Sequence, residues 1–350
     1  MRHPYLASVS VLAVLVGGAA VTNVTLAGQG GSSAAKASAG KYTAPRTRHG
    51  QPDLQGVWTN NAATPVERPK VVADRAMLTD AELAAVRKRA GELFSGDGDA
   101  AFADSVFTAA LGDAKTFTTT DGQTGDYNHF WLVDRWFDHR TSLVIDPPDG
   151  RIPPYTPEAQ KSQDARTAYR KAHPADGPED RSNFEQCLGT PEMPNLLAGY
   201  NSTSQIFQTP GYVVIEQELI HDARIIPLDG RPHVDKNVKL LMGDPRGRWD
   251  GDTLVVDTTN FSARTNLRGA SENLHLVERF TRIAPDTLAY EFTASDPTTW
   301  TKPWTARLLL KSSPDKLFEY ACHEGNVGLV GILGGHRAEE RAAASKSSSR

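Results

Sequence analysis

The sequence lacks a surplus of basic residues: 38 lysines and arginines stand against 42 aspartates and glutamates, which gives a formal net charge of −4. Proteins that hold nucleic acid through its phosphates usually carry a strongly basic patch or a high isoelectric point. We therefore expect no nucleic-acid partner.

Several motifs that would point to a particular chemistry are also missing. The sequence has no Gly-x-Ser-x-Gly nucleophile elbow, no glycine-rich dinucleotide or Walker A loop, and no His-Glu-x-x-His or His-x-His pair. The histidines with a chance of converging come from separate predicted strands; they are His221, His233, His275 and His323. We expect no metal and no cofactor.

Long apolar runs are confined to the N-terminus. Leu6 to Val21 is apolar, follows the weakly basic Arg2 and His3, and precedes small residues around Ala27. This pattern predicts a signal peptide over residues 1–27, followed by a Gly/Ser/Ala-rich flexible linker over residues 28–50. The alternative is an uncleaved membrane anchor, although about 16 residues is short for a span. We expect an exported protein, periplasmic or secreted, with no membrane contact after cleavage.

Cysteine is scarce as well. Cys187 and Cys322 are the only two in the chain. In an exported protein a single pair favours one disulfide, and closing so long a loop is worth at most about 4–5 kcal/mol in the loop-entropy model. Two separate buried thiols are the alternative.

Helix signals lie in the first half of the chain, at about residues 66–190. Thr79 has the features of an N-cap, with Asp80 and Glu82 in the first turn, and Thr156 precedes a proline at the first helical position. We interpret this region as a helical insertion.

From residue 204 onward the pattern changes to short alternating segments separated by turn residues. Hairpins are predicted around Pro210-Gly211, Asp250-Gly251, Pro285-Asp286 and Pro314-Asp315. Sequential hairpins form an antiparallel meander, and closing a meander removes its exposed edges. With Gly56-Val57-Trp58 similar to the Gly-x-Trp that opens lipocalin-like barrels, we predict a mainly β, lipocalin-like barrel. It would be a single domain over residues 51–340, followed by a frayed tail over residues 341–350.

Alternation assigns the faces of the predicted strands. Interior positions include Leu276, Glu278 and Phe280, then Leu288, Tyr290 and Phe292, and also Phe318, Tyr320 and Cys322. Glu278 is then an acid on an apolar stripe, where desolvation would raise its pKa and suit it to proton transfer. The alternative is a glutamate paired with an arginine near the strand end.

The principal candidate site is His221-Asp222-Ala223-Arg224, which lies between two apolar runs. Ionisable groups in such a place need partners or water. Asp222 and Arg224 can share one face of a strand and orient an anionic or hydroxylated ligand. A structural ion pair is the alternative.

Two further clusters are candidates. Cys322-His323-Glu324-Gly325-Asn326 offers groups for proton transfer and hydrogen bonding, or is simply a polar strand end. Trp304, with Trp300 nearby and Trp58 in the first strand, offers stacking surface for a sugar or aromatic ring, or plugs the end of a barrel.

The chain resembles an uncharacterised family of exported bacterial proteins. The phrases that carry the resemblance are PDLQGVW, RTSLVIDPPDGRIP, QTPGYVVI, IHDARIIPLDGRPH, GRWDGDTLVVDTTNF, GASENLHLVERFTR, DPTTWTKPWTA and YACHEGN. The resemblance implies export and extends over most of the chain from Gln51 to Glu340, but it carries no reaction, substrate or catalytic residues.

Together these features predict an exported barrel with a pocket for a small organic ligand, carbohydrate-derived or aromatic. An acid–base lyase or hydrolase would use His221 or His323 as base, Glu278 or Glu324 as acid and Arg224 as anion stabiliser. The ligand-binding candidates are Asp222, Trp304, Asn326 and Trp58. The alternatives are a binding protein without catalysis and a structural module of the cell envelope. The sequence does not predict an oligomeric state.

Overall fold

The computed structural model describes residues 42–94, 104–112, 135–190, 192–196 and 200–348. The expected signal peptide and most of the expected linker lie outside these residues. The strands are β1 (Gly56–Thr59), β2 (Val144–Asp146), β3 (Thr203–Gln208), β4 (Tyr212–Gln217), β5 (Ala223–Pro227), β6 (Asp244–Asp250), β7 (Thr253–Thr259), β8 (His275–Ala284), β9 (Thr287–Ser295) and β10 (Trp304–Ser313). The α-helices are α1 (Asp80–Leu93), α2 (Asp104–Leu111), α3 (Pro157–Ala172) and α4 (Val327–Ser348).

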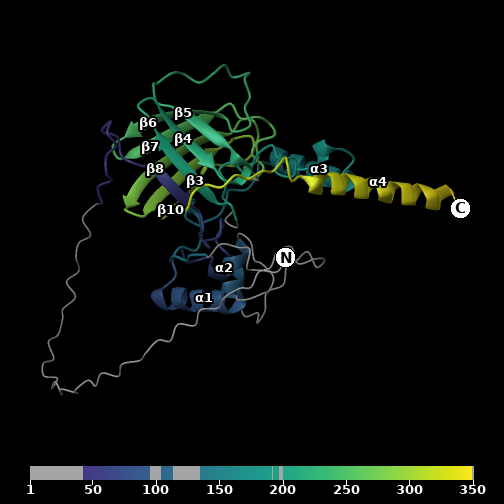
Figure 1. Cartoon of the computed structure of the whole chain (residues 1–350). Coiled ribbons are helices and arrows are strands. Elements are labelled where there is room, and N and C mark those ends of the chain that lie inside the picture. Colours follow the sequence, from purple (N-terminus) through teal and green to yellow (C-terminus); the bar gives the residue numbers. More distant parts are fainter. Residues whose placement is uncertain (1–41, 95–103, 113–134, 191, 197–199, 349–350) are drawn as a thin grey trace, which may run out of the picture. The chain divides into compact units, whose positions relative to one another are not determined.

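All ten strands belong to one antiparallel sheet (Figure 1). Its order is β5-β4-β3-β1-β10-β9-β8-β7-β6, with β2 paired to β10 beside this path. The early strand β1 separates the two groups of hairpins, because it pairs with β3 on one side and with β10 on the other. The fold is therefore mainly β, with the first three α-helices inserted between β1 and β3.

The sheet does not close into the predicted barrel. Its edge strands β5 and β6 share no ladder of hydrogen bonds. They nevertheless pack closely through side chains: a Cβ added to Gly247 of β6 would lie 2.7 Å from Cγ2 of Ile226 and 2.6 Å from Cδ2 of Leu228. In a closed barrel, backbone hydrogen bonds would join these two edge strands. Here the side chains of Ile226 and Leu228 pack against the backbone of Gly247 instead.

Local signals set most of the hairpins. Asp250 pairs with Thr253 across the loop Gly251-Asp252, and Gly251 has φ 59°, a conformation that a residue with a Cβ rarely adopts. The hairpins β3–β4 and β8–β9 also form where the sequence predicts them.

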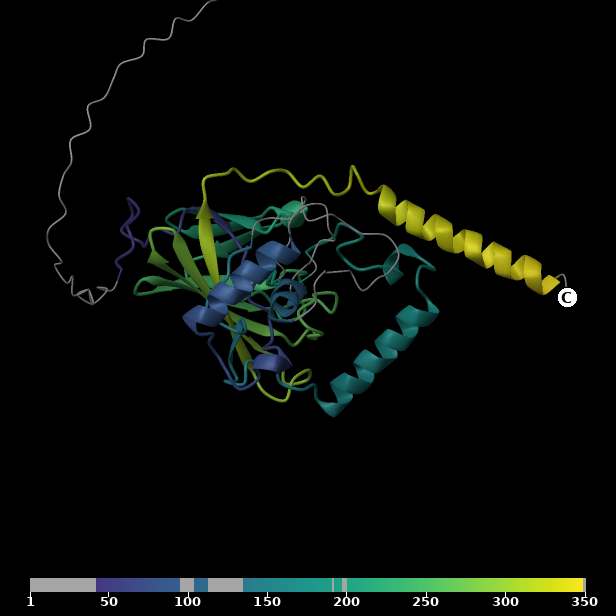
Figure 2. The same ribbon diagram turned by 90° about the horizontal axis from the view of Figure 1, so that it is seen from below.

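The predicted hairpin at Pro314-Asp315 is wrong. β10 forms its first half, but residues 314–326 contain neither helix nor strand, and Phe318 is exposed rather than interior. Figure 2 follows this irregular segment from β10 to α4. The reason is that β10 already has neighbours on both sides: β9 on one, and β2 and β1 on the other.

Two groups of buried apolar side chains form the core. The larger lies within the sheet and includes the inward-facing residues of β8 and β9, as the alternation predicts. The second joins α1 and α2, with Val86 and Phe107 among its buried members.

The helices begin at the predicted caps. The Thr79 hydroxyl accepts a hydrogen bond from the Glu82 backbone N–H, and the Glu82 carboxylate accepts one from the Thr79 backbone N–H. Thr156 caps α3 with its hydroxyl alone, which accepts a hydrogen bond from the Ala159 N–H. Up to Ser348, the residues of the expected tail belong to α4. Within the described part of the chain, no helix has both the length and the apolarity needed to cross a membrane.

Cys187 and Cys322 form a disulfide, with Cα atoms 5.7 Å apart and 135 positions apart in sequence. The bond attaches the irregular segment after β10 to a turn that follows α3. A disulfide of this kind is typical of an oxidising compartment.

Candidate functional site

A buried ion pair lies inside the sheet. Arg224 on β5 is 5% exposed, and Glu278 on β8 is fully buried. The guanidinium donates two hydrogen bonds to the carboxylate, from Nη1 to Oε1 at 2.8 Å and from Nη2 to Oε2 at 2.5 Å. Such a bidentate pair compensates two charges that would otherwise be costly to bury.

Two hydroxyls complete this cluster. Tyr290 donates to Oε1 of Glu278 at 2.8 Å, and Thr258 lies 3.3 Å from Nη2 of Arg224. Burial raises the pKa of the Tyr290 hydroxyl well above its usual value, and the Glu278 charge adds to this effect. Burial opposes the charge of Arg224, but the carboxylate of Glu278 outweighs it and the pKa of Arg224 is raised. Tyr290 therefore stays protonated and Arg224 stays charged.

The cluster forms part of the wall of a cavity within the sheet. The cavity has a volume of about 50 Å³. Such a volume holds a few water molecules or one small group. Its apolar wall consists of Trp58, Pro194, Ile206, Ile215, Phe280, Leu308 and Leu310. Its polar wall consists of Asn60, Asn195, Asn201, Ser202, Thr203, Ser204, Gln217, Arg224, Glu278 and Tyr290.

Several polar atoms on this wall are buried without a hydrogen-bond partner among the described residues. They are Nδ2 and Oδ1 of Asn60, Oε1 of Gln217 and Nε of Arg224. Asn60 is 6% exposed and follows β1 directly. A buried amide with both ends unpaired is unusual, because each unmade hydrogen bond costs about 1–3 kcal/mol. A group that enters the cavity would satisfy these atoms.

Two of the four residues predicted to converge do so. Arg224 and Glu278 meet in the cavity, but His221 is not part of its lining. His221 belongs to a short 3-10 turn, Leu219–His221, and its Nε2 lies 3.1 Å from Oε1 of Glu216. The turn separates β4 from β5 and directs His221 to a half-exposed position.

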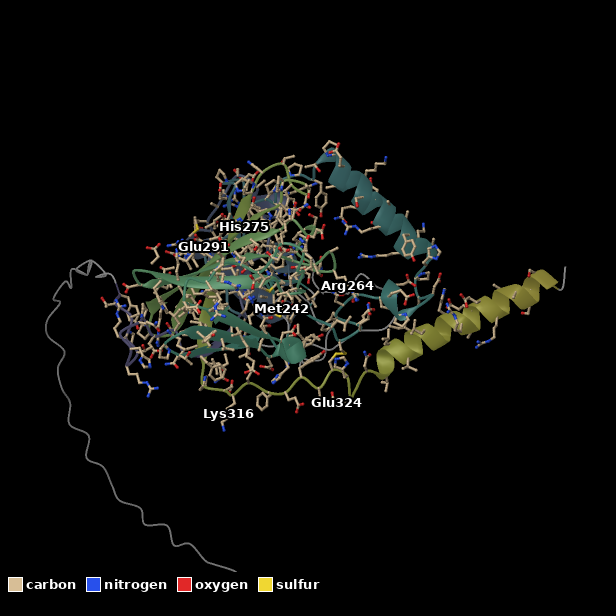
Figure 3. The ribbon with its side chains drawn as sticks, turned by 90° about the horizontal axis from the view of Figure 1, so that it is seen from above. Met242, Arg264, His275, Glu291, Lys316 and Glu324 are labelled. Atoms are coloured by element: carbon tan, nitrogen blue, oxygen red, sulfur yellow. A yellow bond between two sulfur atoms is a disulfide. The ribbon has the colours of Figure 1, made fainter. Side chains whose placement is uncertain are left out.

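Asp222 also lies apart from Arg224. It lines a smaller cavity together with Gly189, Thr190 and Met242, the last of which is labelled in Figure 3. The pKa of the Asp222 carboxyl is raised, because burial outweighs the opposing effect of a hydrogen bond from the Thr190 backbone. The carboxylate that orients Arg224 is Glu278.

The predicted cluster after the last strand is not part of the cavity either. His323 and Glu324 are exposed on the irregular segment, where Figure 3 labels Glu324. Asn326 donates through Nδ2 to the Glu185 carbonyl at 2.9 Å and contacts Sγ of Cys187. Asn326 thus supports the disulfide region.

The tryptophans have different positions. Trp58 lines the cavity, and its Nε1 donates to the Leu54 carbonyl at 2.9 Å. Trp304 is fully buried and packs edge-on against Phe292 and Trp300, away from the cavity lining. Trp304 therefore packs in the core and presents no stacking surface to the cavity, and since the sheet does not close, it plugs no barrel end either.

Two other histidines share one carboxylate. His233 Nε2 lies 3.1 Å from Oδ1 of Asp257, and His275 Nε2 lies 2.9 Å from Oδ2 of the same residue. His275 is labelled in Figure 3. The four histidines singled out from the sequence do not form a group of metal ligands within the described residues.

Sequence reasoning missed Asn60, Gln217 and the role of Tyr290. Tyr290 was identified as interior by alternation, but Asn60 lies just beyond a strand in a polar stretch, Thr59-Asn60-Asn61, that is typical of a loop. Only the pairing of β1 with β3 brings Asn60 to the cavity.

Comparisons with known proteins add little. No family model matches the chain, and no curated protein matches it, so the family resemblance is not confirmed. One solved structure that matches is that of a mutant of the fluorescent protein UnaG, at 12% identity and a TM-score of 0.21. The match covers 38% of this chain and 87% of the other. At so low a TM-score it supports neither a closed barrel nor a ligand. What the structure itself shows is a mainly β protein with one disulfide and a cavity whose wall carries the Arg224–Glu278 pair.

Proposed function

We propose that this protein is an exported small-molecule-binding protein whose ligand occupies the cavity between Asn60 and the Arg224–Glu278 pair. The observation that carries the proposal is the Asn60 amide, which is buried on the cavity wall with neither its nitrogen nor its oxygen bonded to a described residue. The missing hydrogen bonds of this amide destabilise the empty protein, and a ligand that supplies the missing partners removes this destabilisation.

The wall also indicates the chemistry of the ligand. Arg224 and Glu278 neutralise each other, so the cavity offers no net charge to a charged group. The unpaired atoms include donors, at Asn60 Nδ2 and Arg224 Nε, and acceptors, at Asn60 Oδ1 and Gln217 Oε1. A neutral group that both donates and accepts, such as a carboxamide or a hydroxyl, fits these atoms, and a short aliphatic body fits the apolar wall.

Binding is favoured over acid–base catalysis. A general base needs to lie within hydrogen-bond reach of the reacting atom, and no histidine is part of the lining. Glu278, the acid of the catalytic hypothesis, has both oxygens engaged by Arg224 and one of them also by Tyr290. The disulfide and the expected signal peptide support export.

Asn60→Leu tests this proposal, because it removes both amide atoms with little change of volume. The melting temperature and the binding of acetamide, ethanol and dichloromethane are measured for the purified full chain, by thermal shift and calorimetry. We expect acetamide or ethanol to bind the natural chain more tightly than dichloromethane, and Asn60→Leu to weaken that binding about tenfold, the loss of one or two hydrogen bonds. Without ligand, the melting temperature of the variant should equal or exceed that of the natural chain.

Asn61→Leu is the matched control. Asn61 is adjacent to Asn60 but outside the cavity lining, and its Oδ1 accepts a hydrogen bond from Thr59 at 2.7 Å. This variant should retain probe binding. The proposal is overturned if Asn60→Leu destabilises the empty protein by more than about 1 kcal/mol, the cost of a satisfied structural amide, or if both variants bind the polar probes as the natural chain does.

A further inference from the structure

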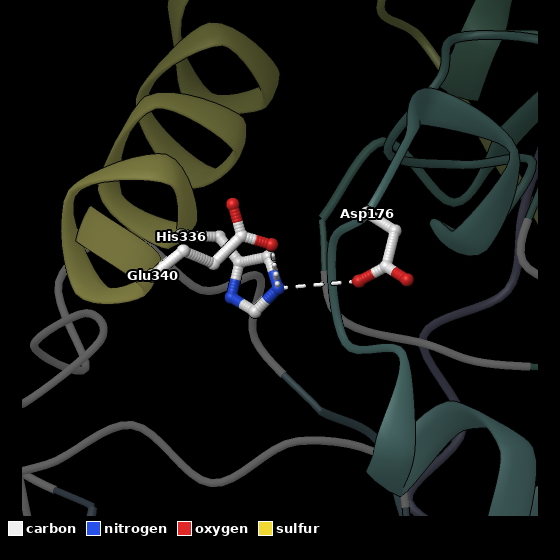
Figure 4. Close-up of side chains that lie close together, drawn as sticks. All are labelled: Asp176, His336 and Glu340. Carbon is white, nitrogen blue, oxygen red and sulfur yellow. Dashed lines mark hydrogen bonds and ion pairs between the residues drawn. The ribbon is translucent and has the colours of Figure 1, made fainter. Parts of the chain in front are cut away.

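A second group of chemically active side chains, none of which lines the cavity, lies between α4 and the turn after α3. Asp176 faces α4, and His336 and Glu340 extend toward it from the helix (Figure 4). His336 and Glu340 are four positions apart, so they lie on one face of the helix, one turn from each other. The two sides of the group are 160 positions apart in sequence.

The distances within this group suit a metal ion. His336 Nε2 lies 3.2 Å from Oδ1 of Asp176 and 3.6 Å from Oε1 of Glu340. The three ligand atoms all lie within 4.8 Å of one another. In a tetrahedral zinc site with bonds of about 2.0–2.2 Å, ligand atoms are roughly 3.3–3.6 Å apart. Only small side-chain rotations separate the observed arrangement from that geometry.

Neighbouring residues orient two of the three ligands. His173 Nδ1 lies 2.7 Å from Oδ2 of Asp176, which leaves Oδ1 directed toward His336. Arg337 holds Glu340 through Nε to Oε2 at 2.7 Å and Nη2 to Oε1 at 2.9 Å. Outer partners of this kind fix the ligands in many metal sites. The Arg337 charge opposes a cation, whereas the two carboxylates outweigh it.

We propose that Asp176, His336 and Glu340 bind a divalent transition-metal ion, with Zn²⁺ the best fit to one imidazole and two carboxylates. The His336 side chain is 18% exposed and the two carboxylates are about half exposed, so the site is reached from solvent and keeps a coordination position for water. This site is independent of the cavity and of the proposed ligand.

A metal here would fasten α4 to the body of the protein. Besides this group, Arg337 holds the helix by donating to the carbonyls of Ala175 and Asp176, at 3.1 and 2.8 Å. The disulfide fixes the chain just before the helix begins. The ion would therefore add a cross-link roughly two and a half to three and a half turns into α4, at His336 and Glu340, and slow the exchange of the helix's backbone amides.

The test uses the full chain, purified with a tag that contains no histidine and treated with a chelator. Zn²⁺ binding is measured by calorimetry, Co²⁺ binding by visible absorption, and α4 protection by hydrogen exchange. We expect one ion per chain, a tetrahedral Co²⁺ spectrum and slower exchange in α4 with metal. His336→Ala and Asp176→Asn should each weaken binding at least tenfold, because each removes a ligand.

Glu324→Gln is the matched control, since Glu324 is an exposed carboxylate on the irregular segment before α4 and is not a member of the metal-ligand group. It should bind Zn²⁺ as the natural chain does. His275→Ala serves as a control for histidine elsewhere. Absence of Zn²⁺ and Co²⁺ binding overturns the proposal. So does binding that survives His336→Ala, or that depends on His336 but not on Asp176.

Discussion

Arg224 and Glu278 show how much a single residue depends on its partner. Alternation places Glu278 inside the sheet, and an interior carboxylate without a partner would lose its charge. Arg224 lies 54 positions earlier and reaches it across the interior from an edge strand. The main role of the pair is therefore to stabilise the interior of the sheet. Nε of Arg224 has no hydrogen-bond partner among the described residues and is the atom of the pair that can bind a ligand.

Breaking this pair should be costly, and replacing it should not be. Arg224→Met leaves a buried, unpaired carboxylate, and we expect it to lower the free energy of unfolding by about 3–5 kcal/mol. A triple variant with Arg224→Met, Glu278→Leu and Tyr290→Phe removes both charges and the Tyr290 hydroxyl, so that only the Thr258 hydroxyl loses its partners. It should regain most of that loss. Denaturant unfolding measures both.

Arg248→Met is the control for the first variant, because Arg248 is exposed on β6. It should change the free energy of unfolding by no more than about 0.5 kcal/mol. A loss below about 1 kcal/mol in Arg224→Met would mean that Glu278 finds another partner or binds a proton without cost.

The start of α1 is stabilised by contacts between residues that are close in sequence. Thr79 and Glu82 satisfy each other's backbone N–H groups, and Glu82 also pairs with Arg75. We expect Thr79→Ala to cost about 1 kcal/mol of the free energy of unfolding, the usual worth of an N-cap. Thr301→Ala, at an exposed loop threonine, should cost less than half as much when both are measured by denaturant unfolding.

The same cap predicts a pH dependence. Hydrogen bonds from Arg75 and Thr79 lower the pKa of Glu82 to about 2 in the folded protein, against 4.5 for the free side chain. A lowered folded pKa contributes stability above the unfolded value, and this contribution disappears as the pH falls through the folded one. The difference in melting temperature between the natural chain and Glu82→Gln should therefore be constant above about pH 5 and shrink toward pH 2. A difference that does not change over this window would contradict the role assigned to the carboxylate.

The end of β10 shows where local patterns fail for an element. Residues 317–322 alternate as a strand should, yet they lie in no strand. An alternating pattern shows that a segment could form a strand, but not that a partner strand with a free edge is available to it. β10, the partner expected for this segment, already pairs with strands on both sides. The disulfide, rather than a ladder, holds this segment.

At the scale of the whole molecule, the disulfide cross-links two residues that are 135 positions apart in sequence. It joins two segments that no strand ladder connects. Replacing both Cys187 and Cys322 by serine should lower the free energy of unfolding by about 2–5 kcal/mol, because the unfolded chain regains the entropy of the open loop. The natural chain unfolded in reductant should behave like the variant, and equal stability of oxidised and reduced protein would show that the bond contributes nothing.

The sequence by itself determined the parts of this protein that depend on neighbours in the chain. Helix caps at Thr79 and Thr156, the glycine turn at Gly251 and the inward faces of β8 and β9 follow from local sterics, from hydrogen bonding and from the two-residue period of a strand. The two cysteines, with the expectation of export, were enough to predict their bond.

Only the tertiary structure decided what meets across the sheet. It brought Arg224 to Glu278 and Asn60 to the cavity, left His221 and His323 outside it, and set Asp176 opposite His336. It also left β5 and β6 without a ladder between them, against the prediction of a closed barrel. These outcomes depend on the pairing of β1 between two groups of hairpins and on the packing at Gly247, contacts between residues far apart in sequence whose geometry no local pattern encodes.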